Sequence, residues 1–148
     1  MKSTTQIQTT DATSVRFDSP MITFLRNQGI DFSIREHQHF ELTSEGWMDL
    51  IVESWYEGKY LYVSVAHYGR QNGDAMRDPE IVYLVNMALG RVIPSMYQND
   101  YIGSYQESAF VKEDTLYVKR AIVKDLKSFT RTWVQNLKAQ GHKLEVKN

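Results

Sequence analysis

The chain of 148 residues contains no cysteine, and this absence removes several kinds of chemistry at once. Without thiols there is no disulfide, no thiolate metal ligand and no cysteine nucleophile. Long apolar runs are also missing, since no segment approaches the roughly 20 apolar residues of a membrane-spanning helix. The first 14 residues lack the apolar core of a secretory signal. We therefore expect a cytoplasmic protein with no signal peptide and no membrane partner.

A surplus of charge of one sign is lacking as well. The 17 Lys and Arg against 18 Asp and Glu give a net charge of −1, so the chain as a whole has no general attraction to phosphate backbones. There is no phosphate-binding loop, no dinucleotide fingerprint and no Gly-x-Ser-x-Gly nucleophile elbow. The sequence instead offers 12% aromatic residues, nine Tyr among them, on an ordinary globular composition.

The order of patterns along the chain predicts the domain organisation. Residues 1–16 are polar and lack periodicity, which predicts a disordered tail before a single domain at residues 17–148. Ser19 and Pro20 are typical of a helix start, and Gly29 of its end. Apolar residues then recur at every second position, which predicts strands; the clearest hairpin joins residues 47–56 to 59–68 through a turn at Glu57 and Gly58.

The last third of the chain changes to helical spacing. Its apolar residues recur every three or four positions and predict a long helix that ends at Gly141 and buries Trp133: Ile122, Leu126, Phe129, Trp133 and Leu137. Short turns between sequential strands favour antiparallel pairing. We therefore predict an α+β fold, with a curved antiparallel meander of about five strands packed by a short N-terminal and a long C-terminal helix.

Two central segments, residues 67–80 and 94–107, crowd turn formers, carboxylates and amides between strand-like runs. Asn72, Gly73 and Asp74 predict a turn, and we interpret residues 72–80 as a long loop that Pro79 closes. Loops on a rigid scaffold often carry binding sites. The predicted contact surface comprises Asn72, Asp74, Arg77, Tyr97, Asn99, Asp100, Tyr101 and Tyr105.

One alternative for the same region is a metal site. His67, Asp74, Asp78 and Glu80 could act in a metal-dependent hydrolase or nuclease, with a divalent ion held by His67, Asp74 and Asp78. Their spacing matches neither an EF-hand loop nor a nuclease core, and carboxylates that cap turns explain it more simply. The leading expectation is no catalytic residue and no cofactor, with His67 hydrogen-bonded to Asp74 or Asp78.

Two further features bear on partners. Tyr97, Tyr101 and Tyr105, interleaved with amides, could stack bases or grip a peptide, although Tyr is also a good strand former. The last helix carries the one local positive patch, which a solvated helix face explains most simply and nucleic-acid contact explains as the alternative: Lys119, Arg120, Lys124, Lys127 and Arg131.

Residues 67–80, 97–107 and 129–141 are similar to an uncharacterised family of small bacterial proteins met on plasmids, conjugative elements and phage-like islands. The resemblance spans roughly residues 20–142. It implies a setting among the accessory genes of mobile DNA, and it implies no reaction. The leading hypothesis is a non-enzymatic module that binds a protein or a nucleic acid. The alternatives are the metal-dependent enzyme and a homodimer formed through exposed strand edges.

Overall fold

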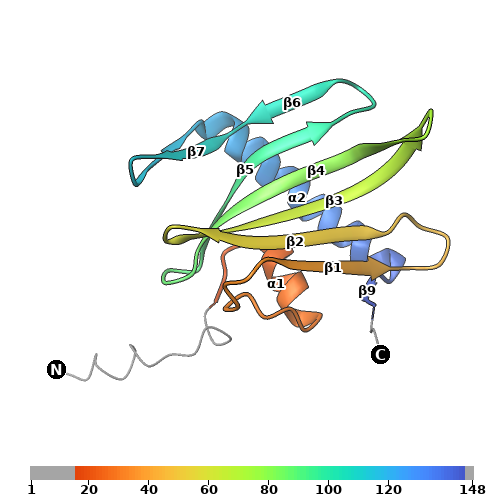
Figure 1. Ribbon diagram of the computed structural model, residues 1–148, viewed down its shortest axis with the longest axis horizontal. Helices are drawn as coiled ribbons and strands as arrows, with labels where there is room; N and C mark the ends of the chain where they lie inside the picture. Colours follow the sequence, from red (N-terminus) through yellow and green to blue (C-terminus); the bar gives the residue numbers. More distant parts are fainter. Residues whose placement is uncertain (1–15, 146–148) are drawn as a thin grey trace.

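The computed structural model describes residues 16–145, so residues 1–15 of the expected tail lie outside the described residues. It has a seven-stranded sheet with the order β6-β5-β4-β3-β2-β1-β9 and a separate β7-β8 hairpin. Both helices lie on one face of the large sheet, behind it in Figure 1. The strands are β1 (Gln38–Thr43), β2 (Leu50–Glu57), β3 (Tyr60–Gln71), β4 (Asp74–Asn86), β5 (Arg91–Asn99), β6 (Ser104–Glu107), β7 (Ala109–Lys112), β8 (Thr115–Val118) and β9 (Lys143–Leu144).

The α+β class, the two helices and the antiparallel meander are confirmed, since β1 to β6 pair in chain order. The sheet is larger than the expected five strands. Residues 101–110 contribute to two strands, β6 and β7, and β9 adds a two-residue strand beside β1. No helix of residues 16–145 is long and apolar enough to cross a membrane.

The interpretation of residues 72–80 as a long loop is wrong. Strand β3 continues to Gln71 and β4 begins at Asp74, so only Asn72 and Gly73 form the turn. Their φ angles of 53° and 84° fit the tight turn whose twist matches that of a hairpin. Pro79 closes no loop. It lies buried within β4, where the register with β3 shifts between Ala66 and Tyr68 and no ladder donor is required.

One smaller expectation also needs correction. The turn between β2 and β3 consists of Gly58 and Lys59, one residue later than expected, because Glu57 still pairs with Tyr60. Proline is usually confined to the end or edge of a strand, but β5 runs through Pro94 to Asn99. The register of β4 and β5 shifts between Val82 and Tyr83, next to the position opposite Pro94. A bulge of this kind accommodates a residue that lacks a backbone donor.

Helix α1 (Pro20–Asn27) begins as expected, because the Ser19 hydroxyl accepts a hydrogen bond from the Ile22 backbone N–H. Helix α2 (Arg120–Gln140) ends at Gly141, whose φ of 79° suits glycine. Trp133 is 6% exposed, which confirms its predicted burial, whereas Phe129 is 39% exposed. The buried face of α2 comprises Leu126, Thr130, Trp133, Val134 and Leu137.

The core lies between the sheet and the two helices. Alternate residues of β2, β3 and β4 point toward the helices, and Val52, Val63, Val65 and Ile81 are completely buried there. Burial of each such aliphatic side chain contributes about 1.5–3 kcal/mol relative to exposure. The core therefore fixes α2 across the sheet. The place of α2 in turn determines where the side chains on its exposed sides lie.

Candidate functional site

The two polar segments of the sequence meet at one corner of the sheet, where the β3-β4 turn and the β5-β6 turn lie side by side at the right of Figure 1. The Arg77 backbone N–H donates to Asp100 Oδ2 at 2.8 Å, and the Asp100 N–H donates to the Arg77 carbonyl at 2.9 Å. The Arg77 guanidinium lies 3.4 Å from Asp100 Oδ1. We call this region the Arg77 corner: Tyr68, Arg77, Asp100, Tyr101, Ile102 and Tyr105.

The polar groups of the Arg77 corner pair with one another. Arg77 Nε lies 3.2 Å from Glu80 Oε1, and the Ser64 hydroxyl donates to Glu80. Asp78 accepts from the Asn99 amide at 3.1 Å. The backbone N–H of Arg77 holds the pKa of Asp100 below its usual range. A network closed in this way fixes the two turns against each other and leaves its carboxylates few free lone pairs for chemistry.

Aromatic side chains form the exposed rim of the Arg77 corner. Tyr101 and Tyr105 are 43% and 60% exposed. The Tyr101 hydroxyl donates to the Arg70 carbonyl at 3.4 Å, and its ring lies over Gly69, where any Cβ would collide with it. Tyr97 behaves differently, since it packs against the core and contacts Phe129 edge-on at 5.8 Å. Two of the three predicted contact tyrosines are therefore available to a partner.

His67 has partners that the sequence did not indicate. The Trp133 indole N–H donates to its Nε2 at 3.1 Å, so Nδ1 carries the proton of the neutral ring and donates to the Asp49 carbonyl at 2.9 Å. The expected bond to Asp74 or Asp78 is wrong. Burial lowers the pKa of His67, which favours this neutral form. Both ring nitrogens are engaged, so His67 anchors α2 to the β2 end of the sheet.

The residues proposed for a metal ion do not gather. Glu80 is held by Ser64 and Arg77, while Asp74 is exposed beside the β3-β4 turn. Among residues 16–145, no group of three or more His, Asp or Glu could hold a metal ion. The described part of the chain thus lacks the convergence of carboxylates and imidazole that the hydrolase or nuclease hypothesis requires.

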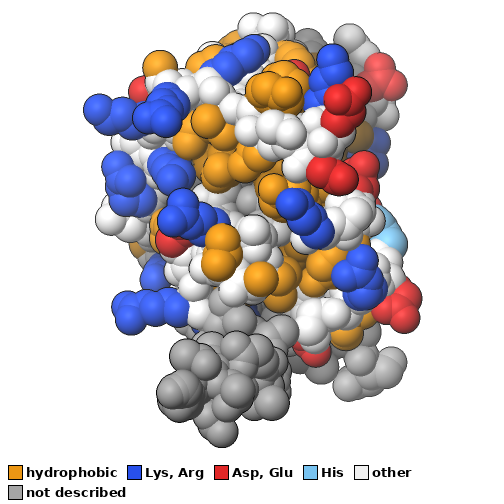
Figure 2. All heavy atoms as spheres, turned by 90° about the vertical axis from the view of Figure 1, so that its left-hand side faces the viewer, with side chains coloured by type: hydrophobic (Ala, Val, Ile, Leu, Met, Phe, Trp, Pro, Cys, Tyr) orange, Lys and Arg blue, Asp and Glu red, His pale blue; other side chains and the backbone are white. Residues whose placement is uncertain are grey.

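A groove lies along the first half of α2 and has a volume of about 440 Å³. Figure 2 shows Lys and Arg side chains gathered on one side of this face of the molecule around hydrophobic atoms, while most Asp and Glu lie toward the opposite edge. Aliphatic side chains from β5, β8 and α2 form its floor. We call it the basic groove: Ile93, Val118, Arg120, Val123, Lys124, Lys127 and Arg131.

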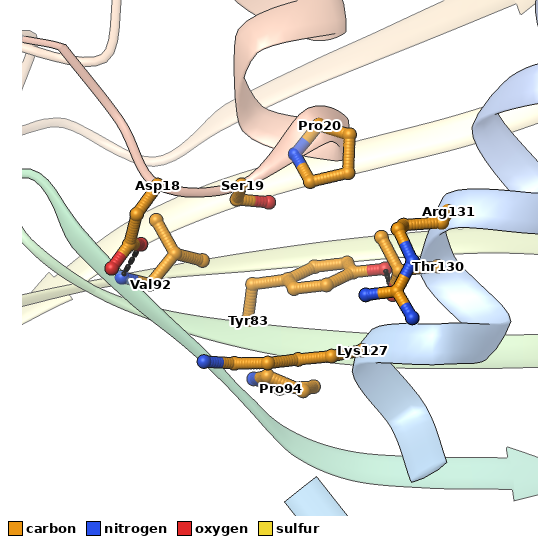
Figure 3. A pocket seen from close by; sticks show the side chains of 9 residues that line it. All are labelled: Asp18, Ser19, Pro20, Tyr83, Val92, Pro94, Lys127, Thr130 and Arg131. Atoms are coloured by element: carbon orange, nitrogen blue, oxygen red, sulfur yellow. Dashed lines mark hydrogen bonds between the residues drawn. The ribbon is translucent and has the colours of Figure 1, made fainter. Parts of the chain in front are cut away.

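A small pocket of about 80 Å³ adjoins the basic groove and shares Lys127 and Arg131 with it. In Figure 3 these two side chains lie beside the ring of Tyr83, which forms the floor. The Tyr83 hydroxyl shares a buried hydrogen bond of 2.7 Å with Thr130, and burial raises the pKa of Tyr83. Asp18 stands at the rim and accepts from the Val92 N–H at 2.7 Å.

The basic residues of α2 are evident in the sequence, but the groove that they border is not. The cations recur at one per helical turn, which the sequence shows, whereas Ile93 and Val118 reach the same place only through the fold. No local pattern in the sequence therefore indicates the aliphatic side chains that form the floor of the groove.

With both surfaces described, the family can be stated. Residues 22–143 match the model of a family described as Domain of unknown function (DUF6908). The chain belongs to this family. A search of the curated proteins and a search of the solved structures found no match. The DUF6908 match covers the Arg77 corner and all residues of the basic groove, so both surfaces belong to the domain itself.

Proposed function

We propose that the protein is a non-enzymatic binding module, an accessory of a bacterial mobile genetic element in the cytoplasm, and that its Arg77 corner contacts a partner protein. The observation that carries this proposal is the exposed set of Tyr101, Ile102 and Tyr105 on a turn that Asp100 ties to Arg77. Tyrosine is enriched at protein interfaces because its ring offers a large contact area and its hydroxyl a polar end.

The scaffold supports this role. The partner meets a surface whose turns are already fixed by Asp100 and Asn99, so little conformational entropy is lost on binding. Carboxylates surround the corner, including Asp78, Glu80 and Asp100. A surface of this charge disfavours a phosphate backbone and favours a protein partner.

A homodimer is the second candidate, and the place of β6 favours it. β6 (Ser104–Glu107) is the last strand of the sheet order and pairs only with β5 among the described residues. An edge strand of this kind offers backbone donors and acceptors to a strand of another copy. Light scattering on the purified protein tests this candidate: a dimer that Gln106→Pro converts to a monomer supports it, and a monomeric parent protein overturns it.

The leading proposal is tested by co-purification from the native host with the tagged parent chain and a Tyr101→Ser, Tyr105→Ser variant. We expect a protein that is recovered with the parent in near-stoichiometric amount and lost with the variant. Leu89→Ser is the matched control, because Leu89 is 67% exposed at the opposite end of β4. A partner that both variants retain equally would contradict the proposal, provided that both melt at the temperature of the parent.

A further inference from the structure

Four cations of the basic groove form one continuous stripe on α2. Arg120, Lys124, Lys127 and Arg131 follow each other at intervals of four, three and four residues. At 3.6 residues per turn they fall within an arc of about 60° and extend over about 16 Å of the helix axis. The stripe borders the buried face of α2, so its side chains overhang the groove instead of pointing straight into solvent.

The stripe forms no ion pair in the described structure, although Asp18, which accepts from the Val92 N–H, lines the adjoining pocket with Lys127 and Arg131. The ion pairs of residues 16–145 join His37 to Glu53 and Arg77 to Glu80 and Asp100, and none includes a residue of the stripe. The one carboxylate of residues 119–131 is Asp125, which lies about 100° around the helix from the edge of the stripe. In a chain of net charge −1, this concentration of positive charge stands out from its surroundings.

The groove also offers apolar surface beside the charges. Ile93, Val118 and Val123 line it, and none of them can pair with a charged ligand group. The β7-β8 hairpin supplies Val118 to the groove, whereas the stacked rings of Phe110 and Tyr117 lie on the other face of the hairpin and outside the groove, because successive residues of a strand point to opposite faces. A positively charged wall beside an apolar floor can hold a phosphate backbone on one side while the bases lie against the apolar side chains.

We propose that the basic groove binds single-stranded nucleic acid, with phosphates along the stripe and bases over the aliphatic floor. One cation per helical turn suits a ligand that carries one charge per repeat unit. No ordered polar side chain within the groove selects a particular anion, which fits binding without sequence preference. This site goes beyond the protein contact proposed for the Arg77 corner and shares no residue with it.

The test is fluorescence anisotropy of a labelled 15-nucleotide thymidine strand with the full chain, from 50 to 200 mM salt. Contact with four phosphates predicts a slope of log K against log salt of about −2.8 and a loss of affinity of roughly 50-fold over this range. Lys124→Gln and Lys127→Gln should each reduce the magnitude of the slope by about 0.7. Val118→Ser should weaken binding with the slope unchanged, because Val118 lines the floor, and Tyr117→Ser on the other face of the hairpin should bind like the parent.

Lys143→Gln is the matched control, because Lys143 is exposed on β9, the strand at the other end of the sheet order from β5 and β6. It should change neither affinity nor slope, and the Tyr101→Ser, Tyr105→Ser variant should bind the strand like the parent. Three outcomes overturn the proposal: no binding at 50 mM salt, equal effects of Lys143→Gln and Lys124→Gln, or tighter binding of a peptide of alternating Glu and Leu. The last outcome would assign the groove to an acidic protein segment.

Discussion

The Arg77 corner and the basic groove lie at opposite ends of β5 and use their charges in opposite ways. At the corner, Arg77 meets Glu80 and Asp100 within 3.4 Å, and neighbouring amides complete the network. In the groove, the four cations of α2 have no ion-pair partner among the described residues. Charges that are already paired hold two turns together, whereas charges without partners remain available to a ligand.

The largest effect is expected at Trp133 on α2, the helix that carries the basic groove. Trp133→Ala should lower the free energy of unfolding by about 3–5 kcal/mol, because it opens a cavity and removes the donor to His67 Nε2. Denaturant unfolding measures this loss. Phe129→Ala is the comparison, since Phe129 contacts the Trp133 ring one helical turn away but is 39% exposed and should lose less. Equal losses for the two variants would show that α2 is not anchored through Trp133.

A smaller effect is expected at the corner. Arg77→Gln should lower the free energy of unfolding by about 1 kcal/mol, near the upper end for ion pairs of a partly exposed side chain. The same denaturant titration measures it, and the loss should shrink at high salt. An unchanged stability would mean that the corner is not held by Arg77, and it would remove the contrast with the groove.

The stability of the fold should depend on pH through His67. Burial lowers its pKa in the folded state below the ordinary 6.5, so the folded form prefers the neutral ring. Its contribution to stability is complete above about pH 6.5 and is lost as the pH falls below that value. An NMR titration of the ring should report a pKa under 6.5, and His67→Gln should flatten the stability between pH 7 and 5. A ring that titrates at 6.5 or higher contradicts the assignment.

The smallest stability effect is expected in the groove. A variant that combines Lys124→Gln, Lys127→Gln and Arg131→Gln should unfold within about 0.5 kcal/mol of the parent, because it breaks no ion pair. Beside Arg77→Gln, this variant tests the comparison directly. A loss of several kcal/mol would show that the three cations support the fold and have partners of their own.

The same contrast explains what the sequence could predict. The helices and the inner strands were readable because burial on one face imposes a period on apolar residues such as Val63, Val65 and Trp133. The outer halves of β3 and β4 could not be predicted from the sequence. Residues 68–78 are mostly polar, and ladder hydrogen bonds hold them in place of burial. The partners of His67 and the floor of the groove come from residues far away in the chain, and no local pattern signals such contacts.

The most direct test is a map of amide chemical shifts as the 15-nucleotide thymidine strand is added to the full chain. The shifts should change in the first half of α2, in the β7-β8 hairpin and near Ile93, and the amides of Arg77, Asp100 and Tyr101 should stay unchanged. That result would place nucleic-acid binding in the groove and leave the corner free for a protein. Changes centred on the Arg77 corner, with the stripe on α2 silent, would contradict the division of roles between the two regions.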